Sequence, residues 1–195
     1  MENYNLLVTH HPNQVGLAEK EVRRQIKEAG GTIEKLDSSC VSGVFCVEVS
    51  GDAKEIVSNV REEFHEDPGT LTQTFHWMPV DRWVRATVDE MAEAARELAE
   101  GIGENERWMM HMHKRRHDMS SEELVLALTE PISKGKVDLR RPDKIIAVEV
   151  LGAMAGMSLV TRDQIVDANR LRQLVGAPKI YSISKGKVDL RRPDK

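Results

Sequence analysis

The stretch that decides the fold runs from Arg107 to Val160 and reads RWMMHMHKRRHDMSSEELVLALTEPISKGKVDLRRPDKIIAVEVLGAMAGMSLV. Its first part alternates, with Trp108, Met110 and Met112 on one side and histidines on the other, which predicts a strand. Leucines at helical spacing then predict a helix over Ser120–Thr129. Apolar runs at 145–150 and 157–160 predict two more strands. The order strand, helix, strand, strand favours a binding platform over an active site.

Most of the cations in this stretch stand in two places. The first is the run Lys114-Arg115-Arg116, flanked by histidines at the expected end of the first strand. Three neighbouring cations repel one another unless an anion neutralises them. Phosphates neutralise such runs and release counterions, and arginine also binds phosphate through two hydrogen bonds or stacks on a base. On composition alone a solvated strand end is the favoured interpretation, and only the resemblance described below reverses this.

The second basic cluster lies in the loop after the helix and contains Lys134, Lys136, Arg140 and Arg141. Gly135 stands between its lysines and allows the backbone to approach a ligand closely. Asp138 and Asp143 stand among these cations and would oppose phosphate if they pointed outward.

Net charge divides the chain where the pattern changes. Residues 1–104 hold 10 Lys and Arg against 20 Asp and Glu, a net charge of −10. Residues 105–195 hold 18 against 12, a net charge of +6. Such asymmetry indicates one half that avoids polyanions and one that binds them.

Several classes of protein are excluded by what the sequence lacks. It shows no membrane-length apolar run and no secretory leader, and two cysteines supply no disulfide framework, so we expect a cytoplasmic, reduced protein. No phosphate loop, dinucleotide fingerprint or nucleophile triad is present, which predicts no cofactor. His111, His113 and His117 lack a nearby acidic or cysteine ligand and adjoin cations, so we predict no metal. A small hydrolase using these histidines is a rival hypothesis.

The N-terminal half predicts the order strand, helix, strand, strand, helix, strand, which is that of a ferredoxin-like domain. Helical spacing from Ala18 to Ala29 ends at Gly30-Gly31, and Asp52 is placed to cap the second helix. The expected strands are Asn5–Thr9, Thr32–Leu36, Gly43–Val49 and Thr72–Met78. Further helices are expected over Val88–Glu100 and Arg162–Leu174, and residues 78–87 are expected to form a packed connection.

The last thirteen residues repeat an earlier stretch without change, since ISKGKVDLRRPDK occurs at 132–144 and again at 183–195. A recent duplication or a cloning artefact would give such a tail. The alternative is an ordered extension that pairs with a sheet edge or another chain.

The HKRR run at 113–116 and, twenty residues on, the run KVDLRRPDKIIAVEV at 136–150 resemble the THUMP domain, the RNA-binding module of several tRNA-modifying enzymes. This resemblance implies an α+β fold with a ferredoxin-like domain at 1–84, a THUMP domain at 85–175 and a tail at 176–195. It also implies that Asp138 and Asp143 fix turns, with Val137 and Leu139 packed in the core. The implied RNA contacts are His113, Lys114, Arg115, Arg116, Lys134, Lys136, Arg140 and Arg141.

Fewer than forty residues follow the THUMP-like part, so the chain is most similar to stand-alone THUMP proteins that serve cytidine acetylation. That similarity implies a non-enzymatic adaptor. It would grip the acceptor stem and 3′ end of tRNA and present a cytidine to a separate RNA cytidine acetyltransferase for N4-acetylcytidine formation. DNA and membrane are not expected as partners. The alternative is an RNA-binding subunit of another split tRNA-modifying enzyme, for thiolation or methylation.

Overall fold

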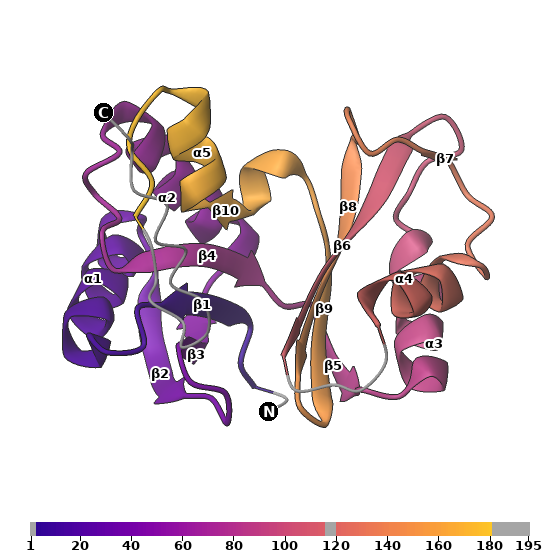
Figure 1. The fold of residues 1–195 in the computed structure, drawn as a ribbon, viewed down its shortest axis with the longest axis horizontal. Helices are drawn as coiled ribbons and strands as arrows, with labels where there is room; N and C mark the ends of the chain where they lie inside the picture. The colour runs from indigo at the N-terminus through magenta and orange to yellow at the C-terminus, as the bar shows by residue number, and fades with distance from the viewer. Residues whose placement is uncertain (1–2, 116–119, 181–195) are drawn as a thin grey trace, which may run out of the picture.

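The protein consists of two α/β units whose sheets face each other, with helices on the outer sides (Figure 1). The computed structural model describes residues 3–115 and 120–180. Within these residues each sheet has five strands, in the orders β10-β4-β1-β3-β2 and β5-β9-β8-β6-β7. The α+β fold class predicted from the sequence is confirmed.

The first unit has the predicted ferredoxin-like order. Its elements are β1 (Leu6–His10), α1 (Val15–Glu28), β2 (Thr32–Ser38), β3 (Val44–Ser50), α2 (Ala53–Glu66) and β4 (Thr74–Pro79). All pairings among its strands are antiparallel, with β1 between β3 and β4. Apolar residues at helical spacing turn α1 and α2 onto one face of this sheet, where they form the first core. Asp52 caps α2 as predicted, since its carboxylate accepts a hydrogen bond from the Lys54 N–H at 2.8 Å.

The second unit contains the predicted strand, helix and two strands together with shorter elements. It comprises β5 (Arg82–Arg85), α3 (Val88–Ala99), β6 (Arg107–Arg115), α4 (Ser121–Thr129), β7 (Lys136–Val137), β8 (Lys144–Leu151) and β9 (Met154–Val160). Strand β6 pairs in parallel with both β7 and β8, so the chain must cross over through α4. Helices α3 and α4 cover the outer face of this sheet and form the second core with it.

The segment after β9 returns to the first unit. It forms a 3-10 turn, η1 (Arg162–Gln164), then β10 (Val166–Asp167) and α5 (Ala168–Leu174). The prediction of one helix over Arg162–Leu174 was wrong, because Val166 and Asp167 pair with β4 and the Asp167 carboxylate caps the shorter α5. Residues 166–174 therefore pack on the first sheet, although the sequence assigned them to the second domain. The predicted division at residues 84 and 85 stays a prediction.

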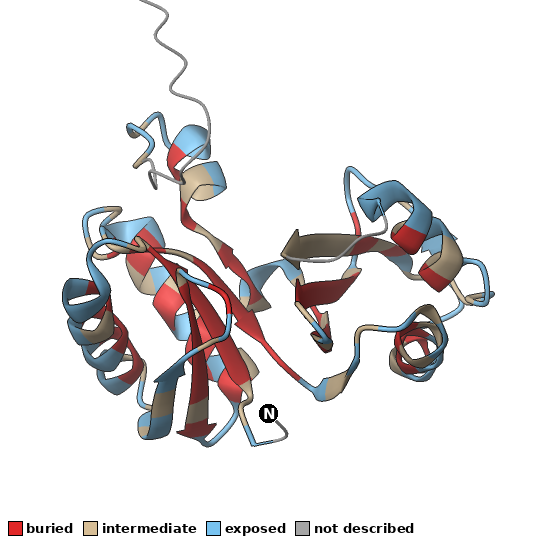
Figure 2. Ribbon diagram, turned by 60° about the horizontal axis from the view of Figure 1, so that its bottom comes forward, coloured by how far each residue is buried: buried red, intermediate tan, exposed pale blue. Residues whose placement is uncertain are grey.

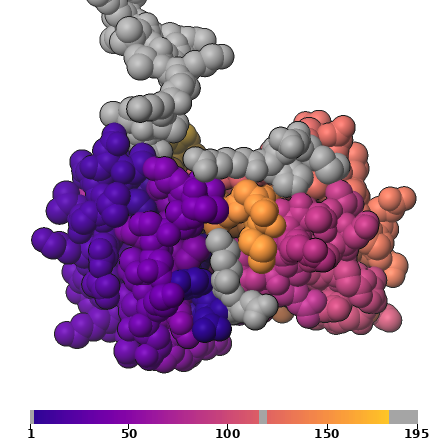
Figure 3. All heavy atoms as spheres, turned by 90° about the horizontal axis from the view of Figure 1, so that it is seen from below, coloured from indigo at the N-terminus to yellow at the C-terminus, as the bar shows by residue number. Residues whose placement is uncertain are grey.

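A third apolar cluster fills the space between the two sheets. Its buried members come from both units: Leu7, Val41, Val44, Cys46, Met78, Val80, Ile145, Ala147, Leu151, Val160 and Ile165. Buried residues accordingly lie along the strands of both sheets, while the outer sides of the helices are exposed (Figure 2). Seen from below, orange atoms of the β8–β9 region lie between the first unit and the magenta part of the second (Figure 3). The indole N–H of Trp83 donates to the Tyr4 carbonyl, which adds a hydrogen bond between the two units.

Among the described residues, none of the helices combines the length and apolar character that crossing a membrane requires. Cys40 is exposed and Cys46 is buried, and the two form no disulfide in the described part of the chain.

Candidate nucleic-acid interface

The cationic run at the end of β6 is split between the two faces of its sheet. Successive side chains of a strand point to opposite faces. Met112 packs into the core beneath the helices, so Lys114 shares that side, and its charge contributes to lowering the pKa of Glu123, after the hydrogen bonds of Glu123 with Ser120. Arg115 points to the other face, toward the first unit. Arg116, the third cation of the run, lies outside the described residues.

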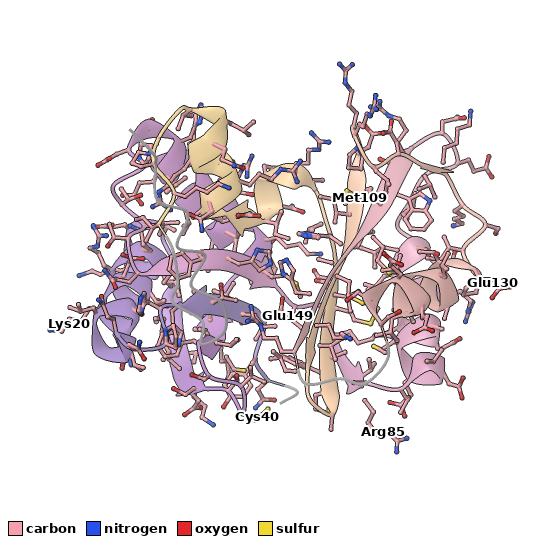
Figure 4. The ribbon with its side chains drawn as sticks, viewed as in Figure 1. Lys20, Cys40, Arg85, Met109, Glu130 and Glu149 are labelled. Atoms are coloured by element: carbon pink, nitrogen blue, oxygen red, sulfur yellow. The ribbon has the colours of Figure 1, made fainter. Side chains whose placement is uncertain are left out.

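Arg115 and His113 both contact Glu149 of β8. Glu149, which Figure 4 labels, has a side chain that is only 1% exposed. The Arg115 Nε–H donates to Glu149 Oε1 at 3.0 Å, and His113 Nδ1 lies 3.2 Å from Oε2. Burial by itself would raise the pKa of Glu149, but the hydrogen bond from His113 and the surrounding positive charges lower it. Two of the predicted RNA contacts therefore already have an internal carboxylate as their partner.

The second basic cluster is built on an edge strand. The Trp108 indole N–H donates to the Lys134 carbonyl at 2.8 Å, and the Lys136 N–H donates to the Glu106 carbonyl at 2.9 Å. Gly135 has a φ of +66°, and a Cβ there would stand 2.6 Å from the Glu106 carbonyl oxygen. The glycine that the sequence linked to close approach of a ligand is thus required by the packing of this loop.

The two aspartates in the loop hydrogen-bond to neighbouring groups, as predicted. The Asp138 carboxylate accepts hydrogen bonds from the backbone N–H groups of Arg140 and Arg141. Asp143 binds the backbone and guanidinium of Arg107 at 2.8–3.2 Å. The prediction that Val137 and Leu139 pack in the core was wrong, since they are 64% and 69% exposed. A two-residue edge strand has no element beyond it to cover these side chains.

Lys136, Arg140 and Arg141 are exposed, and within residues 3–115 and 120–180 their side chains form no ion pair. Lys134 differs, because its ammonium group lies 2.8 Å from Glu100. This loop therefore presents cations that phosphate groups can neutralise.

The two predicted basic clusters do not meet. The loop pairs with Arg107 at the start of β6, whereas Arg115 ends that strand. The rise of a strand separates these ends by about 26 Å. Figure 4 labels Met109, near the start of β6, and Glu149, which pairs with His113 near the end of that strand.

Three arginines that the sequence did not single out extend the basic surface from the loop to the first unit. Arg61 of α2, Arg162 of η1 and Arg170 of α5 line one groove, which also contains Asp167. Burial first, and then the charges of Arg162 and Arg170, lower the pKa of Arg61, although Asp163 opposes them. The Arg162 guanidinium also donates to the Arg140 carbonyl. No sequence pattern indicates this cluster, because its members come from three separate elements.

Comparison with known proteins identifies the second unit. Residues 85–160 match the sequence model of the THUMP domain, which confirms that resemblance. The chain is also similar to the solved structure of PH1313 from Pyrococcus horikoshii Ot3, with 16% identity and a TM-score of 0.54, over 81% of this chain and 55% of that one. Its similarity to TrmN from Thermus thermophilus has 18% identity and a TM-score of 0.55, over 85% and 47%. These likenesses show a shared fold.

The chain spans about half the length of these two solved structures. The comparison with curated proteins gave no match.

Proposed function

Because residues 85–160 form a THUMP domain, we propose that this chain binds tRNA and acts in tRNA modification. The resemblance noted in the sequence is to an RNA-binding module of tRNA-modifying enzymes. The match to that domain is the observation that carries the proposal.

The surface we assign to RNA is the exposed loop with Lys136, Arg140 and Arg141, continued by Arg162 and Arg170. Arginine guanidinium groups bind phosphate through paired hydrogen bonds, and each neutralised phosphate adds salt-sensitive affinity. Exposed Val137 and Leu139 lie in the same loop and offer apolar contact to a sugar or an unstacked base. Recognition of this kind follows the backbone and shape of RNA more than its sequence.

In its finer form, the proposal makes the chain an adaptor without catalytic activity of its own. It would grip the acceptor stem and 3′ end of tRNA and present a cytidine to a separate RNA cytidine acetyltransferase. We place this function in the cytoplasm, in keeping with two cysteines that are not joined by a disulfide. The alternative is an RNA-binding subunit for thiolation or methylation, and co-purification of the catalytic partner separates the two.

The test is tRNA affinity against salt concentration, for the full chain and for the variant Lys136→Ala/Arg140→Ala/Arg141→Ala. We expect wild-type affinity to fall steeply with salt and to require the 3′ overhang of the tRNA. The triple variant should bind more weakly, with a salt slope shallower by roughly two, since up to three phosphate contacts are lost.

A charge-matched control removes one lysine and two arginines elsewhere. Lys20, Arg23 and Arg96 are exposed on α1 and α3, and the variant Lys20→Ala/Arg23→Ala/Arg96→Ala should bind like wild type. Equal losses of tRNA affinity in the two triple variants would mean that net charge alone governs binding. Absence of wild-type binding would overturn the proposed function.

The adaptor role has a separate readout. Acetylation of tRNA by the partner acetyltransferase should require this chain, and the loop variant should slow it in proportion to its weaker tRNA binding. Acetylation that proceeds equally well without the chain would refute the adaptor role and leave tRNA binding intact.

A further inference from the structure

Three histidines and a glutamate from both units meet between the two sheets. His111 and His113 lie two residues apart on β6 and share one face, and Glu149 of β8 stands beside His113 in the strand register. His76 reaches them from β4 of the first unit. Its ring centroid lies 4.7 Å from that of His113 and 6.1 Å from that of His111. The expectation that no acidic residue completes the histidine set considered only neighbours in sequence, and the fold supplies Glu149.

We propose that His76, His113 and Glu149 form a binding site for one divalent transition-metal ion of the zinc class, held between the two units. One potential ligand atom from each residue lies within 4.8 Å of the others. Imidazole nitrogen and carboxylate oxygen are ligands that zinc prefers.

The state of His76 is the second observation that points to a ligand. This side chain is 7% exposed, and its buried Nδ1 atom has no hydrogen-bond partner among residues 3–115 and 120–180. A buried nitrogen of this kind costs free energy unless something binds it. A neutral imidazole nitrogen is the form that coordinates metals.

The geometry requires only a small contraction. A zinc ion with bonds of about 2.0–2.2 Å places tetrahedral ligand atoms roughly 3.4 Å apart. The ligand atoms of His76, His113 and Glu149 now lie within 4.8 Å of one another. The two most distant of them would therefore approach by about 1.4 Å. His113 has a side chain that is 38% exposed, which gives it room to move. His111 lies beside these ligands, with its ring centroid 4.7 Å from that of His113.

Arg115 would not bind the metal itself, but would orient the Glu149 carboxylate that does. Its hydrogen bond to Glu149 Oε1 fixes the carboxylate and leaves Oε2 directed toward His113. Outer contacts of this kind orient metal-binding carboxylates in other proteins. The competing interpretation is a metal-free ion pair between His113 and Glu149, and it leaves Nδ1 of His76 unexplained.

Binding of metal should be measured on the full chain after treatment with a chelator, without RNA. Calorimetric titration with zinc chloride is expected to show one equivalent bound, and cobalt(II) to give the visible absorption of a low-coordinate site. Zinc should also raise the melting temperature, because only the folded chain assembles ligands from both units. The variants His76→Gln and His113→Gln should each weaken zinc binding at least tenfold.

The control variant is His65→Gln, which changes an exposed histidine of α2 and should bind zinc like wild type. Circular dichroism of each variant shows whether it is folded. The proposal is overturned if wild type binds no zinc or if His76→Gln still binds one equivalent unchanged. Because no RNA is present, neither result bears on the proposed tRNA binding.

Discussion

At the scale of single residues, Glu21 makes the most concentrated set of contacts in the first unit. It lies on the inner side of α1 and is 7% exposed. Its carboxylate accepts hydrogen bonds from the backbone N–H groups of Thr72, Gln73 and Thr74, and from both threonine hydroxyls, at 2.7–3.1 Å. One side chain thereby fixes the entry into β4, the strand that carries His76.

The substitution Glu21→Ala should therefore lower the free energy of unfolding by about 2–4 kcal/mol, because it leaves several donors without an acceptor. Urea unfolding followed by circular dichroism measures this loss. Glu19→Ala on the same helix removes only an exposed pair with Arg23 and should change stability by less than about 1 kcal/mol. Similar losses in the two variants would contradict the role given to Glu21.

The sequence predicted the apolar face of α1 from Ala18, Val22 and Ile26, and these residues are buried. It did not predict the importance of Glu21. A glutamate within a charged helix has the pattern of a solvated residue, and its partners lie some fifty positions further along the chain. Hydrogen bonds over such separations leave no periodic signal.

At the scale of elements, Gly135 decides whether β7 can lie against β6. The substitution Gly135→Ala should destabilise the protein by about 2–4 kcal/mol, because it adds a clash with the Glu106 carbonyl to the strain of a positive φ. Gly152→Ala is the matched control, since Gly152 has a φ of +63° and open space around its Cα. It should lose only about 1 kcal/mol. Thermal unfolding of the two variants measures these losses. Equal losses of stability would show that the positive φ, and not the clash at Gly135, determines the effect.

Long elements were predictable because their periods repeat. The alternation at the start of the quoted stretch gave β6, and leucine spacing with Ser120 gave α4, whose capping box is present. The short strands β5, β7 and β10 were missed because two to four residues carry no period. They form where a neighbouring strand offers an unpaired edge, and that edge exists only in the folded protein.

At the scale of the whole molecule, the cluster between the sheets and the return of β10 join the two units. We expect them to unfold in one transition. Trp77→Phe tests this, because Trp77 lies in the first core while Trp83 and Trp108 remain in the second unit. This variant should lose about 1–3 kcal/mol of stability.

If the units are coupled, fluorescence of the remaining tryptophans in urea should shift to a lower midpoint together with circular dichroism. If the fluorescence midpoint stays at its wild-type value while the circular dichroism transition broadens, the units unfold independently.

The overall fold also determines which residues of the candidate site could be predicted from the sequence. A run of cations suggested one patch, but strand alternation sends Lys114 and Arg115 to opposite faces. The cations of the second cluster lie within one loop, so the sequence alone places them near one another. Arg61, Arg162 and Arg170 share a groove only after the chain has returned to the first unit. His76 meets His113 only when the two sheets pack together.

That return has a consequence for how the chain is made. During translation, strands β1 to β4 leave the ribosome early. The edge strand β10 and the buried Arg172 follow about a hundred residues after the segments that they contact, which are β4 and the Leu71 carbonyl. During that interval the edge of β4 has no partner strand, and the first core still lacks Val166, Ala168 and Leu171. The first part of the protein to be synthesised is thus among the last to be completed.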